Sequence, residues 1–122
     1  MLDNNSGGGL RADGTGGFGA ISVAIADSLV AFNAGNGINA VSGLGNVTVD
    51  IMRVVLESNG SSGIQANQSS GGTANVKIGS TLIYHNNVGV DAVGGASLLS
   101  YSNNQVTGNN SNGSFTGGAG LQ

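Results

Sequence analysis

Three residues of the types needed for nucleophilic hydrolysis fall at equivalent or neighbouring positions of an internal repeat. Ser58 and His85 align in successive repeats, and Glu57 stands diagonal to the histidine. A hydrolase triad also needs a strained nucleophile elbow and an oxyanion-hole loop, and the sequence shows neither. His85 is the only histidine and cysteine is absent, so a zinc-type site has no second nitrogen or sulfur ligand. We therefore predict no catalytic residue, no metal and no cofactor.

The charged residues are few and do not converge. There are six acidic and three basic residues in the chain. Asp27 aligns with Arg53 one repeat later, and Asp50 aligns in the same way with Lys77, which predicts two surface ion pairs of small energetic value. A calcium site requires several converging oxygens, and no acidic residue aligns with another. A lyase site built on clustered aspartates is therefore not predicted.

Several other function classes find no support in the sequence. The string at residues 14–19 matches G-x-G-x-x-G, but a strand pattern at 20–25 follows it where a dinucleotide site needs a helix. The net charge of −3 leaves no basic patch for nucleic acid. No apolar stretch approaches the roughly 20 residues of a membrane span, and residues 1–9 lack a signal-peptide pattern. We predict neither a nucleic-acid partner nor a membrane span.

The composition is typical of stacked strands and tight turns. The chain has 24 glycines and no proline, and only 7% of its residues are charged. Disorder is an unsuitable interpretation because 39% of the residues are apolar, a fraction that disordered chains lack. At 122 residues, the length fits a single domain.

A local marker recurs along the chain, consisting of an asparagine, three residues, a glycine and an apolar residue. Its asparagines are spaced 28, 26, 27 and 23 residues apart, and one copy, at residues 86–90, is a residue shorter. A loose period with a fixed signature indicates that insertions fall in turns. The marker asparagines are Asn5, Asn33, Asn59, Asn86 and Asn109.

Alignment on these asparagines places apolar residues in columns at period two, which is the periodicity of strands. It predicts an all-β, right-handed parallel β-helix of about four to five coils with three short strands per coil. Residues 1–122 form a single domain that begins partway round a coil, and residues 113–122 form a glycine-rich tail. An antiparallel sandwich is the alternative, although a sandwich gives no reason for the residue pattern of one repeat to match that of the preceding repeat. The columns are Val23, Val49, Val76 and Leu99; Ile25, Ile51, Ile78 and Tyr101; Val30, Leu56, Ile83 and Val106; Leu10, Ile38, Ile64 and Val90; and Ala12, Ala40, Ala66 and Ala92.

These residues resemble those of right-handed parallel β-helix repeat proteins, the superfamily that includes pectate lyases. In that family asparagines stack at a turn and hydrogen-bond along the helix, so the resemblance implies a structural ladder of the five marker asparagines. Amide chemistry supports this role because an amide both donates and accepts. The resemblance also suggests an extracellular or cell-surface location, which the residues themselves leave unknown. It implies no activity, because a fold does not specify a function.

Strand alternation directs a second apolar column outward. If the Val30 column faces the core, Leu29, Val55 and Leu82 face outward with Tyr84 beside them, forming a possible contact face. The alternative interpretation is that turns or a terminal segment cover these side chains, or that they are single exposed aliphatic residues of the kind found on any protein surface.

We expect a non-catalytic β-helix scaffold or binding module, a segment of a larger surface or extracellular protein. The alternative is a remnant or fragment of a polysaccharide-processing lyase or hydrolase. The expected partner is a second copy, bound through the N-terminal coil or side by side through this face, and a carbohydrate or protein partner stays open.

Overall fold

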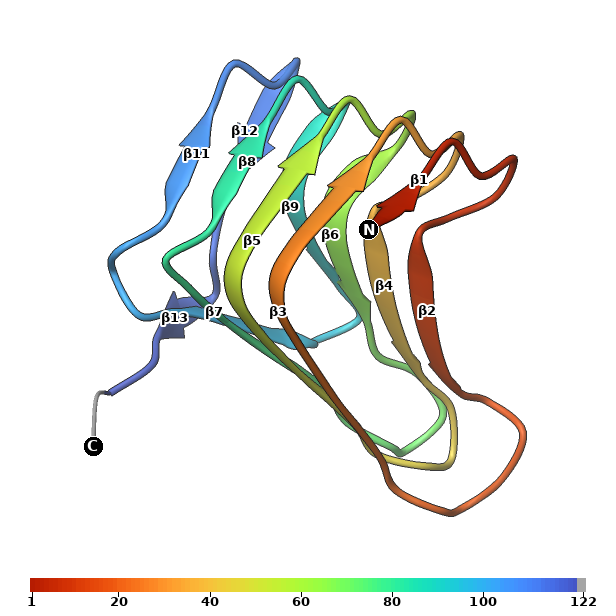
Figure 1. Cartoon of the computed structure of the whole chain (residues 1–122). Helices are drawn as coiled ribbons and strands as arrows, with labels where there is room; N and C mark the ends of the chain where they lie inside the picture. The colour runs from red at the N-terminus through yellow and green to blue at the C-terminus, as the bar shows by residue number, and fades with distance from the viewer. Residues whose placement is uncertain (121–122) are drawn as a thin grey trace.

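Short strands follow one another around each coil and pair in parallel with their equivalents in the next coil (Figure 1). The computed structural model describes residues 1–120, which form a helix-free β-solenoid of about four turns. The predicted parallel β-helix is thereby confirmed, and all pairings between the described strands are parallel, which is inconsistent with the sandwich. The strands are β1 (Leu2–Asp3), β2 (Leu10–Gly14), β3 (Ile21–Ala31), β4 (Ile38–Ser42), β5 (Val47–Glu57), β6 (Ser62–Asn67), β7 (Ala74–Gly79), β8 (Leu82–Tyr84), β9 (Val88–Val93), β10 (Ser97–Ser100), β11 (Gln105–Thr107), β12 (Ser111–Gly113) and β13 (Gly117–Gly118).

Two sheets enclose the core. The smaller has the order β12-β9-β6-β4-β2, and the larger has the order β1-β3-β5-β7-β10-β13, with β8 and β11 continuing from β5. The larger sheet bends along its length, so β3 and β5 each run for 11 residues across the bend. In the next coil the same path is divided into β7 and β8. The coil therefore has three faces, but in the first two full coils two of the predicted short strands are one continuous bent strand.

Single residues in the left-handed conformation form the corners of the coil. The bend in the larger sheet occurs at Asp27, Arg53 and Ser80, whose φ values are 51°, 54° and 49°. A second column directly precedes the ladder asparagines. It contains Asn4, Phe32, Ser58 and His85, with φ values of 53° to 55°. Non-glycine residues rarely adopt this conformation, so its repetition at equivalent positions indicates that the stacked coils impose it.

The predicted inward columns form the core. Val49, Ile51 and Leu56 of β5 are essentially inaccessible to solvent, as are Val76 and Ile78 of β7. The equivalent Val23 and Ile25 of β3 are only half-buried. In the described part of the chain, the first half of β3 pairs with a strand on one side only, which explains the difference.

The predicted columns are wrong by one residue in the last coil. Leu98, not Leu99, pairs with Val76 and is fully buried, and Ser100 rather than Tyr101 follows it in the column. Gly113 pairs with Val90, so it takes the place of the apolar residue after the marker glycine. The two errors have separate causes. One extra residue lies between β10 and β11, since Ser100 and Gln105 pair with Ile78 and Leu82. The last coil also has the same shortened marker as the coil before it, so its equivalent of the marker glycine is Asn112.

Candidate functional site

The five marker asparagines form a continuous ladder of side-chain hydrogen bonds. The amide nitrogen of Asn33 donates to Asn59 Oδ1 at 2.9 Å, and Asn59 repeats the contact to Asn86 at 2.9 Å. Asn5 and Asn109 extend the ladder at its two ends, at 2.8 and 3.1 Å. The three internal members are at most 2% exposed, which confirms the predicted buried asparagine ladder.

Each rung also satisfies the main chain. Asn59 Oδ1 accepts the backbone N–H of Asn33, while Asn59 Nδ2 donates to the carbonyl oxygen of Val30 at 3.1 Å. The left-handed residue before each asparagine turns the chain, and the buried amide takes up backbone groups at that turn. Buried polar groups need such partners, so the ladder stabilises the corner.

The marker glycine is required by the ladder of the next coil. A Cβ atom at Gly37 would lie 2.6 Å from the carbonyl oxygen of Gly63 and 2.9 Å from Nδ2 of Asn59. A Cβ atom added at Gly9, Gly63 or Gly89 would likewise lie within 3.0 Å of a backbone carbonyl oxygen and of an asparagine Nδ2 in the neighbouring coil. The signature thus has a steric origin, and it marks packing rather than chemistry.

The structure does not assemble the candidate hydrolase triad. Ser58 and His85 lie in adjacent coils, but no side-chain hydrogen bond joins them among residues 1–120. The Glu57 carboxylate is instead paired in register with Tyr84, and its interaction with the phenol raises the pKa of that tyrosine. The His85 ring packs against the Tyr84 ring with their centroids 4.7 Å apart. The residue in register with Glu57 is therefore the tyrosine and not the histidine.

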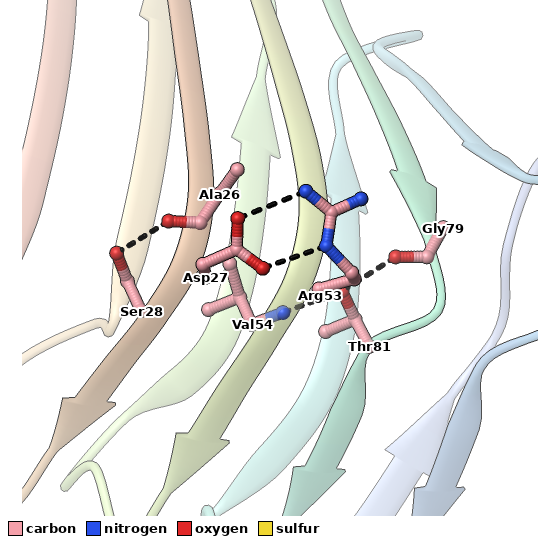
Figure 2. A network of polar contacts seen from close by, with 7 residues as sticks. All are labelled: Ala26, Asp27, Ser28, Arg53, Val54, Gly79 and Thr81. Carbon is pink, nitrogen blue, oxygen red and sulfur yellow. Dashed lines mark hydrogen bonds and ion pairs between the residues drawn. The ribbon is translucent and has the colours of Figure 1, made fainter.

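One of the two predicted ion pairs forms, at the bend in the larger sheet (Figure 2). Arg53 donates from Nε and Nη2 to the two carboxylate oxygens of Asp27, at 2.6 and 2.9 Å. This contact lowers the pKa of Asp27. Both side chains are more than half exposed, so the pair contributes little to stability.

The second predicted ion pair is wrong. Asp50 and Lys77 are in register on β5 and β7, yet no ion pair joins them within the described residues. Exposed partners gain little from pairing, so both side chains retain their solvation.

Sequence reasoning missed the polar contacts of Asp13. Its carboxylate accepts hydrogen bonds from the hydroxyl and backbone N–H of Thr15 and from Arg11. These contacts lower its pKa to about 2, with the Thr15 hydroxyl as the largest cause. The usable signal was the spacing of two residues, which places Arg11 and Asp13 on the same side of β2.

A polar network at the bend was also missed. Thr81 Oγ1 donates to the Gly79 carbonyl oxygen at 2.9 Å and accepts the backbone N–H of Val54 at 3.4 Å (Figure 2). Asn104 Oδ1 accepts the N–H of Thr81 at 2.9 Å. Thr81 is buried and Asn104 is half-buried, and both satisfy backbone atoms at the corner. Thr81 could have been found from the sequence because it aligns with Val54, which is buried.

Two shallow hollows border the turn that carries the ladder. One, of about 370 Å³, is lined by glycine backbone together with Arg11, Asn36 and Asn39. Asn39 Oδ1 is buried and has no hydrogen-bond partner. The other, of about 430 Å³, includes His85 and Asn87. No group of three possible metal ligands occurs among the described residues, so neither hollow contains the elements of a metal site.

The predicted contact face lies on the outer side of β3, β5 and β8. Leu29, Val55 and Leu82 are in register, and all three side chains are half-buried by their neighbours. Ala31, Glu57 and Tyr84 form the adjacent column. The sequence thus predicted the alignment of this face, while the exposure of its apolar column is only partial.

Comparisons with protein-family models, with curated proteins and with solved structures give no significant match. In residues 1–120 there is no helix long and apolar enough to cross a membrane.

Proposed function

We propose that this chain is a non-catalytic β-helix module whose outer β3–β5–β8 face is a contact surface. The observation that carries the proposal is the unbroken, in-register column of Leu29, Val55 and Leu82 on that face. Aliphatic residues aligned across three coils make a contiguous apolar strip, whereas single exposed aliphatics need no explanation.

The side chains that could perform chemistry support the non-catalytic part of the proposal. Glu57 lies in register with Tyr84 and raises the pKa of its hydroxyl, and the guanidinium of Arg53 binds Asp27. His85 packs on an aromatic ring rather than contacting a serine hydroxyl. A general base must lie within hydrogen-bond reach of the group it deprotonates, and this arrangement gives none of them such a target in the chain.

Incubation with a panel of acidic and neutral polysaccharides tests the proposal. Product formation is followed by the absorbance of unsaturated sugars for a lyase and by new reducing ends for a hydrolase. We expect no cleavage by the protein and none by a His85→Ala variant. Cleavage that is abolished by His85→Ala or Glu57→Gln would overturn the proposal and favour the alternative, a pectate-lyase-like polysaccharide-processing enzyme.

A further inference from the structure

We propose that Asn112 is a modification site, at which the side-chain amide is lost by spontaneous deamidation through a cyclic imide formed with the backbone nitrogen of Gly113. Both residues belong to β12 of the smaller sheet, so the site is separate from the proposed contact surface on the larger one. The chain contains three Asn-Gly pairs, which are Asn36-Gly37, Asn59-Gly60 and Asn112-Gly113.

The reaction needs water as its only co-reactant. The Gly113 N–H loses its proton to hydroxide, and the nitrogen forms a bond to Cγ of Asn112. The bond from Cγ to Nδ2 then breaks, and Nδ2 leaves as ammonia after taking a proton from water. Water adds to either carbonyl carbon of the cyclic imide and opens it, which leaves aspartate or isoaspartate at position 112. Glycine favours the ring closure because it has no Cβ atom to crowd the attacking nitrogen.

The local sequence alone does not select Asn112, because Asn59 lies in the same tetrapeptide. Residues 58–61 and residues 111–114 both have the sequence Ser-Asn-Gly-Ser. Any difference in reactivity between these two asparagines therefore arises from the fold.

The fold blocks the reaction at Asn59. Its Oδ1 and Nδ2 are held by four hydrogen bonds in the ladder, and the residue is 2% exposed. The attacking group is also engaged, since the Gly60 N–H donates to the carbonyl oxygen of Asn33 at 2.8 Å. Ring closure requires that these bonds break first, so it depends on local unfolding of the coil.

Asn36 is held in the same way, although it lies outside the ladder. Its Oδ1 accepts the N–H of Ser62 at 2.9 Å, and its Nδ2 donates to Gln65 Oε1 at 3.2 Å. The N–H of Gly37 donates to the carbonyl oxygen of Ser62 at 2.9 Å. The nucleophile and the leaving group are thus both engaged.

At Asn112 the nucleophile and the leaving group are open. Asn112 and Gly113 are exposed, and within residues 1–120 no hydrogen bond involves Asn112 Nδ2. Gly113 takes the position that Leu10 has in the first coil, where the N–H bonds the carbonyl oxygen of Gly37 in the following coil at 2.9 Å. In the described part of the chain β12 is an edge strand of its sheet, so the N–H of Gly113 meets no paired strand on that side.

One contact at Asn112 favours the reaction further. Asn109 Nδ2 donates to Asn112 Oδ1 at 3.1 Å, and this is the oxygen on which negative charge develops as Gly113 attacks. In the preceding coils the equivalent nitrogen donates to the next asparagine of the ladder, and Asn112 Oδ1 takes that place here. A donor aimed at a developing oxyanion stabilises the charged intermediate.

The products should disturb the pairing of β12. Isoaspartate adds a carbon atom to the main chain, which shifts Gly113 out of register with Val90. Hydrogen exchange should therefore quicken at residues 111–113 in protein that contains isoaspartate and stay unchanged in β4 and β6. Unchanged exchange at residues 111–113 would refute this release of the strand.

Incubation of the full chain in mildly alkaline buffer, followed by mass spectrometry of tryptic peptides, tests the modification itself. Trypsin cleaves after Arg11, Arg53 and Lys77, so each Asn-Gly pair falls in a different peptide. Deamidation raises the mass of a peptide by about one dalton, and fragmentation locates the residue and distinguishes isoaspartate from aspartate.

In the folded protein we expect Asn112 to convert at least about tenfold faster than Asn59 or Asn36, because the latter two must open first. Urea supplies the matched control, since it removes the fold and leaves the sequence unchanged. In urea Asn59 and Asn112 should convert at similar rates, because their tetrapeptides are identical. Asn112→Gln should abolish conversion at this position, since a glutamine amide must close a larger and less favourable ring. No conversion at Asn112, a smaller ratio in the folded protein, or a ratio of the same size in urea would overturn the proposal.

Discussion

Replacing Asn59 by alanine tests the ladder at its central member, which is buried. The side chain takes part in four hydrogen bonds, accepting from the backbone and side-chain nitrogens of Asn33 and donating to Val30 O and Asn86 Oδ1. A net value of about 0.5–1.5 kcal/mol for each bond gives about 2–6 kcal/mol. We expect the free energy of unfolding to fall by about 3 kcal/mol, because some of the groups that lose Asn59 as a hydrogen-bond partner keep a second partner.

Urea unfolding followed by circular dichroism, with linear extrapolation to water, measures this loss in the free energy of unfolding. Asn87→Ala is the matched control: Asn87 lies in the next coil, is exposed, and accepts one bond from Asn110, so its loss should stay below about 0.5 kcal/mol. A loss below about 0.5 kcal/mol for Asn59→Ala as well would refute the stabilising role of the ladder.

Asn59→Asp distinguishes the ladder from simple packing. The carboxylate keeps the acceptor that Asn33 uses but loses the donor, and its second oxygen then faces Asn86 Oδ1 and Val30 O. Burial and two facing acceptors raise the pKa of this new group and penalise its ionised form. The variant should therefore be destabilised more at neutral pH than in mild acid, relative to the original chain at the same pH. A difference that does not change with pH would contradict the bonding scheme.

Three further predictions concern the core, the marker glycine and a surface carboxylate. Ile51→Ala should lower the free energy of unfolding by about 2–5 kcal/mol, because Ile51 is 1% exposed and coils on both sides hold the cavity open; a loss below about 0.5 kcal/mol would mean that the strand faces the other way. Gly63→Ala should cost about 1–3 kcal/mol in the same assay, since its Cβ would lie 2.8 Å from a carbonyl oxygen of the next coil, whereas Gly16→Ala, which meets nothing within 4 Å, should cost almost nothing. For Asp13, whose pKa is lowered to about 2 from 3.8, the stabilising contribution is complete above the unfolded value and is lost as the pH falls toward 2; Thr15→Val should raise this pKa in an NMR titration, and an unchanged value would contradict the assigned cause.

The sequence predicted the features that repeat and missed those that occur once. The inward columns through Ile51 and the asparagine ladder recur in every coil, so alignment found them without knowledge of the structure. The contact between Asp13 and Thr15 occurs in one coil only, so aligning the repeats with one another cannot reveal it. The error at Gly113 has the same origin, because a glycine one position away from the shortened marker mimics the signature.

The same regularity explains why fold is easier to infer here than function. Coils pair in register, so any two equivalent residues in successive coils become neighbours, whatever their chemistry. Ser58 and His85 are neighbours for that reason alone, and no hydrogen bond within residues 1–120 joins their side chains. In a solenoid, adjacency of equivalent residues is therefore weak evidence for a site. Asymmetry is stronger evidence. The outward column of Leu29, Val55 and Leu82 is apolar, whereas the outward column of the smaller sheet is polar, and the coil repeat does not require this difference.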